Sequence, residues 1–262
     1  PDIRALAQWW QDEISRLDQR DVIARVRTEA GLDGRYMFMV LMSAGIAILG
    51  LLQSSPAVVI GAMLISPLMG PIIGLGFALA TIDSAEIRRT ILALAVGAVV
   101  AVAFTALIVV VSPLQNVTGE LAARTRPNLF DLVIAVLSAL AGTYATIRGR
   151  AGTVVGVAIA TALMPPLATI GFGIATLNGT VASGAALLFV TNFVAITLTA
   201  AVMARLYGFA RSLSPRQTML GTLIVIAAFG GLAIPLGLSL RQIAWETRVS
   251  RDVRTVLADE FG

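Results

Sequence analysis

The chain has 262 residues, of which 57% are hydrophobic and 13% charged, whereas a soluble domain carries about 25% charged residues. Its mean hydropathy is +0.88. A soluble protein of this length could not bury so much apolar surface, so the composition predicts an integral membrane protein. The net charge is +4, and the arginines behind it crowd into the chain ends and short connectors, a distribution that argues against binding of nucleic acid.

The absence of two residue types limits the reactions and metal sites that the chain could support. The chain has no cysteine and no histidine, which removes disulfides, thiolate metal sites and the commonest general base. No pair of aspartates lies inside the apolar segments either. We therefore expect no cofactor, no metal and no enzymatic activity.

Residues 1–35 precede the apolar segments and alternate acidic, basic and apolar residues at helical spacing. Ile3, Leu6 and Trp10 fall on one face of such a helix, a pattern that predicts an amphipathic cytoplasmic or interfacial segment. The alternative is the last helix of a cytoplasmic domain, and the sequence does not separate the two.

Apolar segments make up most of the remaining chain, and a bilayer crossing needs roughly 20 apolar residues. Seven stretches qualify or nearly do, at residues 36–53, 57–81, 90–111, 129–147, 153–176, 184–207 and 218–240. Residues 112–128 form a longer connector, and residues 241–262 form an amphipathic tail. The prediction is an all-α integral membrane fold with about seven transmembrane helices.

An internal repeat appears when the sequence is compared with itself at an offset of 95 residues. Gly61 then meets Gly156, Pro71 meets Pro166, and Phe77 meets Phe172. The repeat predicts two three-helix units at residues 36–111 and 129–207, with 218–240 as an extra transmembrane helix. Because three crossings are an odd number, the second unit enters the membrane from the opposite side, as in inverted-repeat transporters.

The middle segment of each repeat is rich in proline and glycine. Ser66-Pro67 and Gly70-Pro71 lie in the first copy, and Pro165-Pro166 lies in the second. Proline within a helix removes a donor and clashes with the preceding turn, and broken backbone at membrane depth is tolerated where it lines a cavity or is buried. We predict broken middle helices around a central site, with a kinked packing helix as the alternative.

Uncharged polar groups are the candidates for holding a solute, because no ionisable residue lies in the middle of a predicted span. Ser54 and Ser55 precede Pro56 as at a helix start, and Asn192 has an alternative role in joining helices. The predicted substrate-binding residues are Ser54, Ser55, Ser66, Gly70, Pro71, Thr161, Pro165, Pro166, Thr191 and Asn192. Such groups suit an anion at helix amino ends, a neutral polar solute or a sodium ion.

Arginines also predict the orientation of the chain. The connectors at Arg88, Arg148 and Arg211 fall on the same side as the amino terminus, which the positive-inside rule makes cytoplasmic. Small residues that would let helices of two copies approach closely permit a homo-oligomer. They are Ser43, Gly50, Ala195 and Thr199.

Three motifs resemble a known family. The string SSPAVVIGAMLISPLMGPIIGLGFALAT at residues 54–81, with the later ALMPPLATIGFGIA and TNFVAI, is similar to the prokaryotic membrane family catalogued as domain of unknown function 389, over roughly residues 36–207. The resemblance implies a bacterial or archaeal cell (inner) membrane. Since no activity is established for that family, it implies no substrate and no site residues.

These features together predict a membrane transporter or channel for a small solute or ion, with its site between two proline-broken helices near the bilayer midplane. The alternative is a non-transporting membrane scaffold or sensor coupled to a cytoplasmic domain. A wet cavity between the breaks favours transport, and a dry packed contact favours the scaffold.

Overall fold

The computed structural model describes residues 14, 17–149, 163–209 and 231. Within these residues the fold is all-helical and contains no strand. The helices are α2 (Gln19–Glu29), α3 (Gly34–Leu52), α4 (Pro56–Ile65), α5 (Met69–Thr81), α6 (Ser84–Val111), α7 (Gly119–Ala122), α8 (Leu129–Ile147), α10 (Met164–Ala175) and α11 (Gly179–Leu206). The predicted helix at 218–240 and the tail at 241–262 lie outside this part of the chain, apart from the single residue 231.

Four of the described helices are long and apolar enough to cross a bilayer, namely α3, α6, α8 and α11. The pair α4 and α5 adds a fifth crossing if the two helices are one bent span. Large apolar side chains such as Val99, Val110 and Leu137 are exposed on their outer faces. An exposed apolar surface of this extent indicates a protein that lies in a membrane.

The bent pair shows where the first predicted break falls. α4 and α5 meet at 54°, and the residues between them are Ser66, Pro67 and Leu68. Pro71 lies in the first turn of α5, where a missing N–H costs no hydrogen bond. The predicted break in the helix is therefore found at Pro67, whereas Gly70-Pro71 begins the next helix and does not break one.

The second middle span is described only from Leu163 onward. Pro165 and Pro166 lie in the first turn of α10, the same placement that Pro71 has in α5. Proline is tolerated there because first-turn N–H groups have no partner within the helix. The backbone on the other side of these prolines lies outside the described residues, so a second break stays a prediction.

Helix starts follow from short polar side chains that accept backbone hydrogen bonds. Asp33 accepts from the Tyr36 N–H at 2.7 Å and Asp83 from the Glu86 N–H at 3.1 Å. Asn128 caps α8 and Asn178 caps α11 in the same way. Such caps satisfy N–H groups that a helix leaves free, which fixes where each of these helices begins.

The described helices reproduce the offset of 95 residues. The bounds of α3 and α6, moved by 95, are those of α8 and α11, and α10 begins 95 residues after α5. The left-handed residue after α5, Ile82 with φ 55°, has its counterpart in Leu177 with φ 53° after α10. Left-handed backbone is costly for such side chains. Its recurrence 95 residues apart is therefore strong evidence that the two turns correspond.

Helix α5 packs on α11 as well as on α6, and α10 packs on α6 as well as on α11. Glycines make both contacts close. A Cβ placed on Gly76 would lie 2.9 Å from the Thr197 carbonyl oxygen, and one on Gly171 would lie 2.8 Å from the Val102 carbonyl oxygen. Val102 and Thr197 are themselves 95 residues apart, so the two contacts use equivalent positions.

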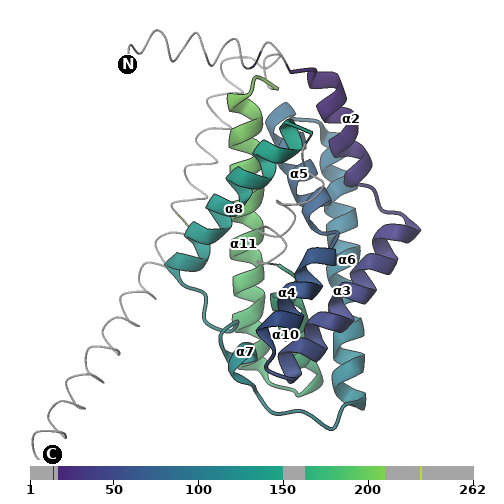
Figure 1. Ribbon diagram of the computed structural model, residues 1–262, viewed down its shortest axis with the longest axis vertical. Helices are drawn as coiled ribbons and strands as arrows, with labels where there is room; N and C mark the ends of the chain where they lie inside the picture. Colours follow the sequence, from purple (N-terminus) through teal and green to yellow (C-terminus); the bar gives the residue numbers. More distant parts are fainter. Residues whose placement is uncertain (1–13, 15–16, 150–162, 210–230, 232–262) are drawn as a thin grey trace, which may run out of the picture.

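The molecule has two ends, which we name by the short helices that lie there (Figure 1). At the α2 end, the Arg27 guanidinium binds Asp83, and the Phe77 ring contacts the Phe209 ring with centroids 5.1 Å apart. At the α7 end, the Thr118 hydroxyl donates to the Leu51 carbonyl oxygen at 2.7 Å. Figure 1 shows α6 and α11 running in opposite directions between these ends.

The small residues that suggested an oligomer interface are used inside the chain. Ser43, Gly50, Ala195 and Thr199 are all buried, and the Ser43 hydroxyl donates to the Ala62 carbonyl oxygen at 2.8 Å. They therefore pack helices of one copy together and carry no argument for a second copy.

Candidate functional site

One cavity contains two of the predicted substrate-binding residues. It has a volume of about 280 Å³ and is lined by Ile60, Met63, Arg124, Asp131, Ile134, Pro166, Leu188 and Asn192. We call it the Asp131–Asn192 pocket. Four helices, α4, α8, α10 and α11, form its walls together with the segment that follows α7. Segments far apart in the sequence therefore form the pocket.

Asp131 is held at the start of α8 by a reciprocal pair of hydrogen bonds. Its Oδ2 accepts from the Asn128 N–H at 2.9 Å, and the Asn128 Oδ1 accepts from the Asp131 N–H at 3.1 Å. This capping box fixes the first turn of α8 and the direction of the carboxylate. The Asp131 side chain is then presented to the pocket with one oxygen committed to the cap.

Arg124 reaches the pocket from the segment that follows α7. Its Nη2 lies 3.2 Å from Glu120 Oε2, and both side chains are 24% exposed. Burial lowers the pKa of Arg124, and the nearby carboxylates of Glu120 and Asp131 partly offset that effect. Arginine nonetheless stays protonated in proteins, so the pocket contains a fixed positive charge.

Asn192 supplies an amide from the middle of α11 and is only 3% exposed. A buried amide needs hydrogen-bond partners to offset its desolvation. Its neighbour Thr191 is also buried, but the Thr191 hydroxyl donates to the Leu187 carbonyl oxygen at 2.7 Å within the same helix. Asn192 therefore lines the pocket, whereas the Thr191 hydroxyl is occupied by its own helix.

The other predicted site residues are placed elsewhere. Ser54 is exposed in the turn between α3 and α4, with φ 54°. Ser55 is the N-cap of α4, as predicted, although its side chain makes no capping hydrogen bond. The length of α4, about 1.5 Å per residue, separates both serines from the break at Ser66. Thr161 lies outside the described residues.

Ser66 lies at the break itself. Its hydroxyl is buried and has no hydrogen-bond partner among the residues that the structure describes. Pro71 and Pro165 are buried in the first turns of α5 and α10. The structure thus brings Pro166 and Asn192 together in one cavity, and Ser66 is not among the residues that line it.

A second cavity, of about 410 Å³, has the predicted residue Gly70 in its lining. It is lined by Thr28, Glu29, Gly31, Asp33, Arg35, Tyr36, Met39, Ile65, Pro67, Met69 and Gly70, and we call it the Glu29–Tyr36 pocket. Three of its lining residues stand 95 positions before residues of the first pocket: Glu29 before Arg124, Tyr36 before Asp131, and Met39 before Ile134.

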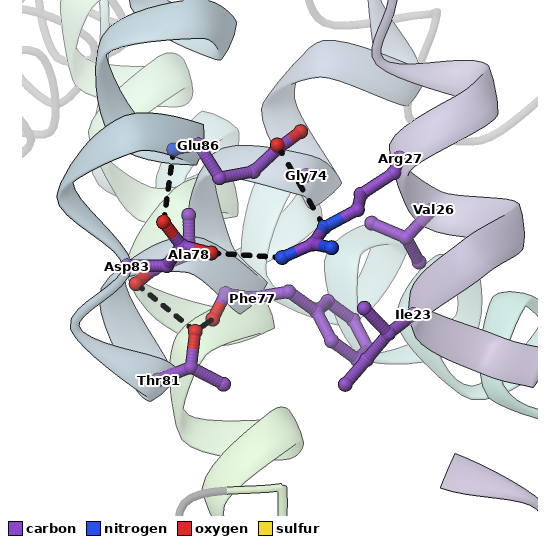
Figure 2. Close-up of a pocket in the computed structure, with 9 residues that line it drawn as sticks. All are labelled: Ile23, Val26, Arg27, Gly74, Phe77, Ala78, Thr81, Asp83 and Glu86. Atoms are coloured by element: carbon purple, nitrogen blue, oxygen red, sulfur yellow. Dashed lines mark hydrogen bonds and ion pairs between the residues drawn. The ribbon is translucent and has the colours of Figure 1, made fainter. Parts of the chain in front are cut away.

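A third cavity, of about 180 Å³, lies under α2 (Figure 2). Arg27 reaches from α2 to the start of α6, where its Nη2 lies 2.8 Å from Asp83 Oδ2 and its Nε lies 3.8 Å from Glu86 Oε2. Figure 2 shows Phe77 and Ile23 beneath this guanidinium. These ion pairs hold α2 against the connection between α5 and α6. We therefore assign the cavity to the packing of α2 on the helices below it and not to a solute site.

The sequence did not identify Arg124 and Asp131 as site residues. Both lie near the boundary between the 112–128 connector and the 129–147 segment, where charges are expected at a membrane surface. The spacing of Asn128 and Asp131 is that of a capping box, a signal in the sequence that could have indicated a fixed Asp131. Nothing in the sequence indicated that α4 and α11 would pack beside it.

The described fold and its cavities define an all-helical, membrane-associated protein with several apolar helices that could span a bilayer. The chain belongs to the family described as Domain of unknown function (DUF389), whose sequence profile matches residues 63–198. This confirms the resemblance seen in the sequence motifs.

A relative in Methanocaldococcus jannaschii, the uncharacterized protein MJ0678, is 28% identical over 198 residues. The alignment covers 76% of this chain and 62% of the relative, so the chain spans less than two thirds of that protein. No solved structure matches the chain.

Proposed function

We propose that the protein is a membrane transporter or channel for a small solute or ion, with the Asp131–Asn192 pocket as its solute site. The observation that carries the proposal is the composition of that pocket. It places an arginine, a carboxylate and a buried amide among the helices of an apolar, membrane-type fold. A buried amide and partly buried charges need polar partners, and a bound solute would supply them.

The repeat offers a second line of support. Matching helix bounds, matching left-handed turns and the exchanged packing of α5 on α11 and α10 on α6 are what two inverted halves related by a two-fold axis would produce. Transporters of that design hold their substrate where the two halves meet, beside discontinuous helices. The Asp131–Asn192 pocket has walls from both halves, because α4 faces α8, α10 and α11 there.

The Asp131–Asn192 and Glu29–Tyr36 pockets suggest the path that a solute would take through the protein. Ile60 and Met63 of α4 line the Asp131–Asn192 pocket, whereas Ile65 and Pro67 line the Glu29–Tyr36 pocket. The last turn of α4 therefore borders both cavities, and the break at Ser66 follows it directly. We propose that displacement of this turn about the 66–68 break connects them, since helix-terminal residues are common hinges in domain and gate motions.

Orientation is proposed from the same arrangement. Arg88 and Arg89 lie near the start of α6, Arg148 follows α8, and Arg205 lies in the last turn of α11. Figure 1 shows these three helix ends at the α2 end, and Arg124 and Arg126 follow α7 in the chain. This bias supports a cytoplasmic α2 end in a prokaryotic cell membrane with several crossings. Arg211 lies outside the described residues.

Flux through proteoliposomes tests the function. The full chain would be reconstituted and screened for uptake of monovalent anions, sodium and small polar solutes. Asn192→Ala removes the pocket amide and should lower flux of the accepted solute by about tenfold, since a hydrogen bond to a charged group contributes about 1.5–3 kcal/mol. Thr199→Ala is the matched control, because the Thr199 hydroxyl donates to Ala195 within the same helix and does not line the pocket.

The absence of flux for every solute in a well-folded preparation would favour the scaffold or sensor alternative. Under that alternative the cavities are gaps in packing, and Asn192→Ala would change stability without changing permeability.

A further inference from the structure

The polar groups of the Asp131–Asn192 pocket have a charge pattern that selects one ligand class. The pocket contains one cation, Arg124, one anion, Asp131, and one amide, Asn192, among five apolar side chains. Its volume of about 280 Å³ is just below the range of about 300–1,000 Å³ typical of drug-sized ligands. A smaller ligand with both polar and apolar parts suits such a cavity.

The two charges do not neutralise each other by direct contact. The Arg124 guanidinium makes its ion pair with Glu120, and no nitrogen of Arg124 lies within 4.0 Å of an oxygen of Asp131. One Asp131 oxygen accepts from the Asn128 N–H, as described above. In the described part of the chain, the buried Nε–H of Arg124 has no acceptor. Each charge therefore keeps capacity for a further partner.

Singly charged ligands fit this arrangement poorly. An anion at Arg124 would also face the Asp131 carboxylate, and a cation at Asp131 would face the guanidinium. Unlike charges attract and like charges repel more strongly in a partly buried site than in water. A ligand that carries both charges a few ångströms apart gains at each wall, and its carboxylate shares Arg124 with Glu120.

We infer that the Asp131–Asn192 pocket binds a small zwitterion, with its carboxylate at Arg124, its ammonium group at Asp131 and its apolar part against Ile60 and Met63. The simplest members of this class are α-amino acids with small or medium apolar side chains. Asn192 then hydrogen-bonds the ligand carboxylate or ammonium group. The inference rests on the proposal that this pocket is the solute site.

Derivatives that lack one charge test the inference directly. L-Alanine and L-leucine would be titrated into the detergent-solubilised full chain by calorimetry, beside their methyl esters, which lack the carboxylate, and their N-acetyl forms, which lack the ammonium group. We expect the zwitterions to bind and each derivative to bind about tenfold to a hundredfold more weakly, the usual loss for one charge-assisted hydrogen bond.

Two variants assign each charge to its wall. Arg124→Gln should weaken binding of the amino acid about tenfold and abolish the preference over the methyl ester. Asp131→Asn should also weaken binding of the amino acid about tenfold and should abolish the preference over the N-acetyl form. The side-chain oxygen of the asparagine can still accept from the Asn128 N–H. Controls are Arg126→Gln and Asp21→Asn, which remove the same charges from exposed positions outside the pocket and should leave binding unchanged.

Other results would overturn the inference. Equal binding of the N-acetyl form, with dependence on Arg124 alone, would show an anion site, and equal binding of the ester, with dependence on Asp131 alone, would show a cation site. No binding of any of the probes would also reject it. Flux separates this from the proposed function: binding without flux would refute transport but keep the zwitterion site, whereas sodium or chloride flux without amino-acid binding would keep transport and refute the zwitterion.

Discussion

The exchanged packing of the two halves predicts equal sensitivity at Gly76 and Gly171. A Cβ added at Gly76 would lie 2.5 Å from Ala200 Cβ and 3.0 Å from the Ala201 nitrogen, whereas carbon atoms in contact are about 3.5–4.0 Å apart. At Gly171 the added atom would meet Thr105 Oγ1 and would lie 3.0 Å from the Ala106 nitrogen. Most of these neighbours are backbone or Cβ atoms, so rotation of a side chain does not relieve the overlap at either site.

The magnitude follows from the shift that alanine would require. At either position one helix would have to move by about 1 Å, and overpacking of this kind typically costs about 1–3 kcal/mol. Alanine also favours the helix over glycine by about 1 kcal/mol. At a site with free space, glycine to alanine should therefore stabilise the protein by about that amount. Gly61 in α4 is that site, because nothing lies within 4 Å of its added Cβ.

The assay is the midpoint of thermal denaturation in mild detergent, read as the fraction of monodisperse protein after heating. Gly76→Ala and Gly171→Ala should both lower the midpoint, by similar amounts, and Gly61→Ala should leave it unchanged or raise it. If both variants melted together with Gly61→Ala, the close packing of α5 on α11 and of α10 on α6 would be refuted. A large loss at one glycine only would contradict the equivalence of the two contacts.

Three further predictions concern topology, the attachment of α2 and the break. Ser84→Cys and Arg126→Cys, made in a chain with no native cysteine, should react with an impermeant label from opposite sides of a sealed membrane. Labelling of both from one side would contradict the arrangement of the α2 and α7 ends. Arg27→Gln should lower stability by only about 0.2–1 kcal/mol, since the Arg27–Asp83 pair is partly exposed, and should increase proteolysis near α2; unchanged proteolysis would show that the apolar contacts of α2 suffice. Pro67→Ala should reduce flux more than Pro71→Ala, because Pro67 lies in the break and Pro71 in a helix start; the reverse order would contradict the hinge at 66–68.

Helix positions were predictable where a polar cap preceded an apolar run. The 129–147 segment agrees with α8 at both ends, since Asn128 and Asp131 mark its start. The segments predicted at 90–111 and 184–207 proved to be the apolar parts of longer helices that begin at Ser84 and Gly179. Hydropathy marks the residues that match the lipid interior, whereas a helix continues into polar turns that it does not detect.

Proline was the ambiguous signal. Pro67, Pro71 and Pro166 look alike in the sequence, yet the first lies in a break and the other two in first turns of helices. The difference depends on which residues continue the helix before each proline, and that is decided by packing. The pocket itself was less predictable still, because Ile60, Arg124 and Asn192 meet only through contacts between distant helices.

The exchange of partners between the halves also bears on how the protein is made. α5 is synthesised long before α11, and until α11 is made the side of α5 at Gly76 lacks its neighbours Thr197, Ala200 and Ala201. α6 likewise waits for α10 to cover Thr105 and Val102. Neither half can therefore reach its final packing while it is alone on the ribosome. The amino-terminal half keeps the contacts of α3 with α4 and α6 and of α5 with α6, but two separately expressed halves should be most stable when they are produced together.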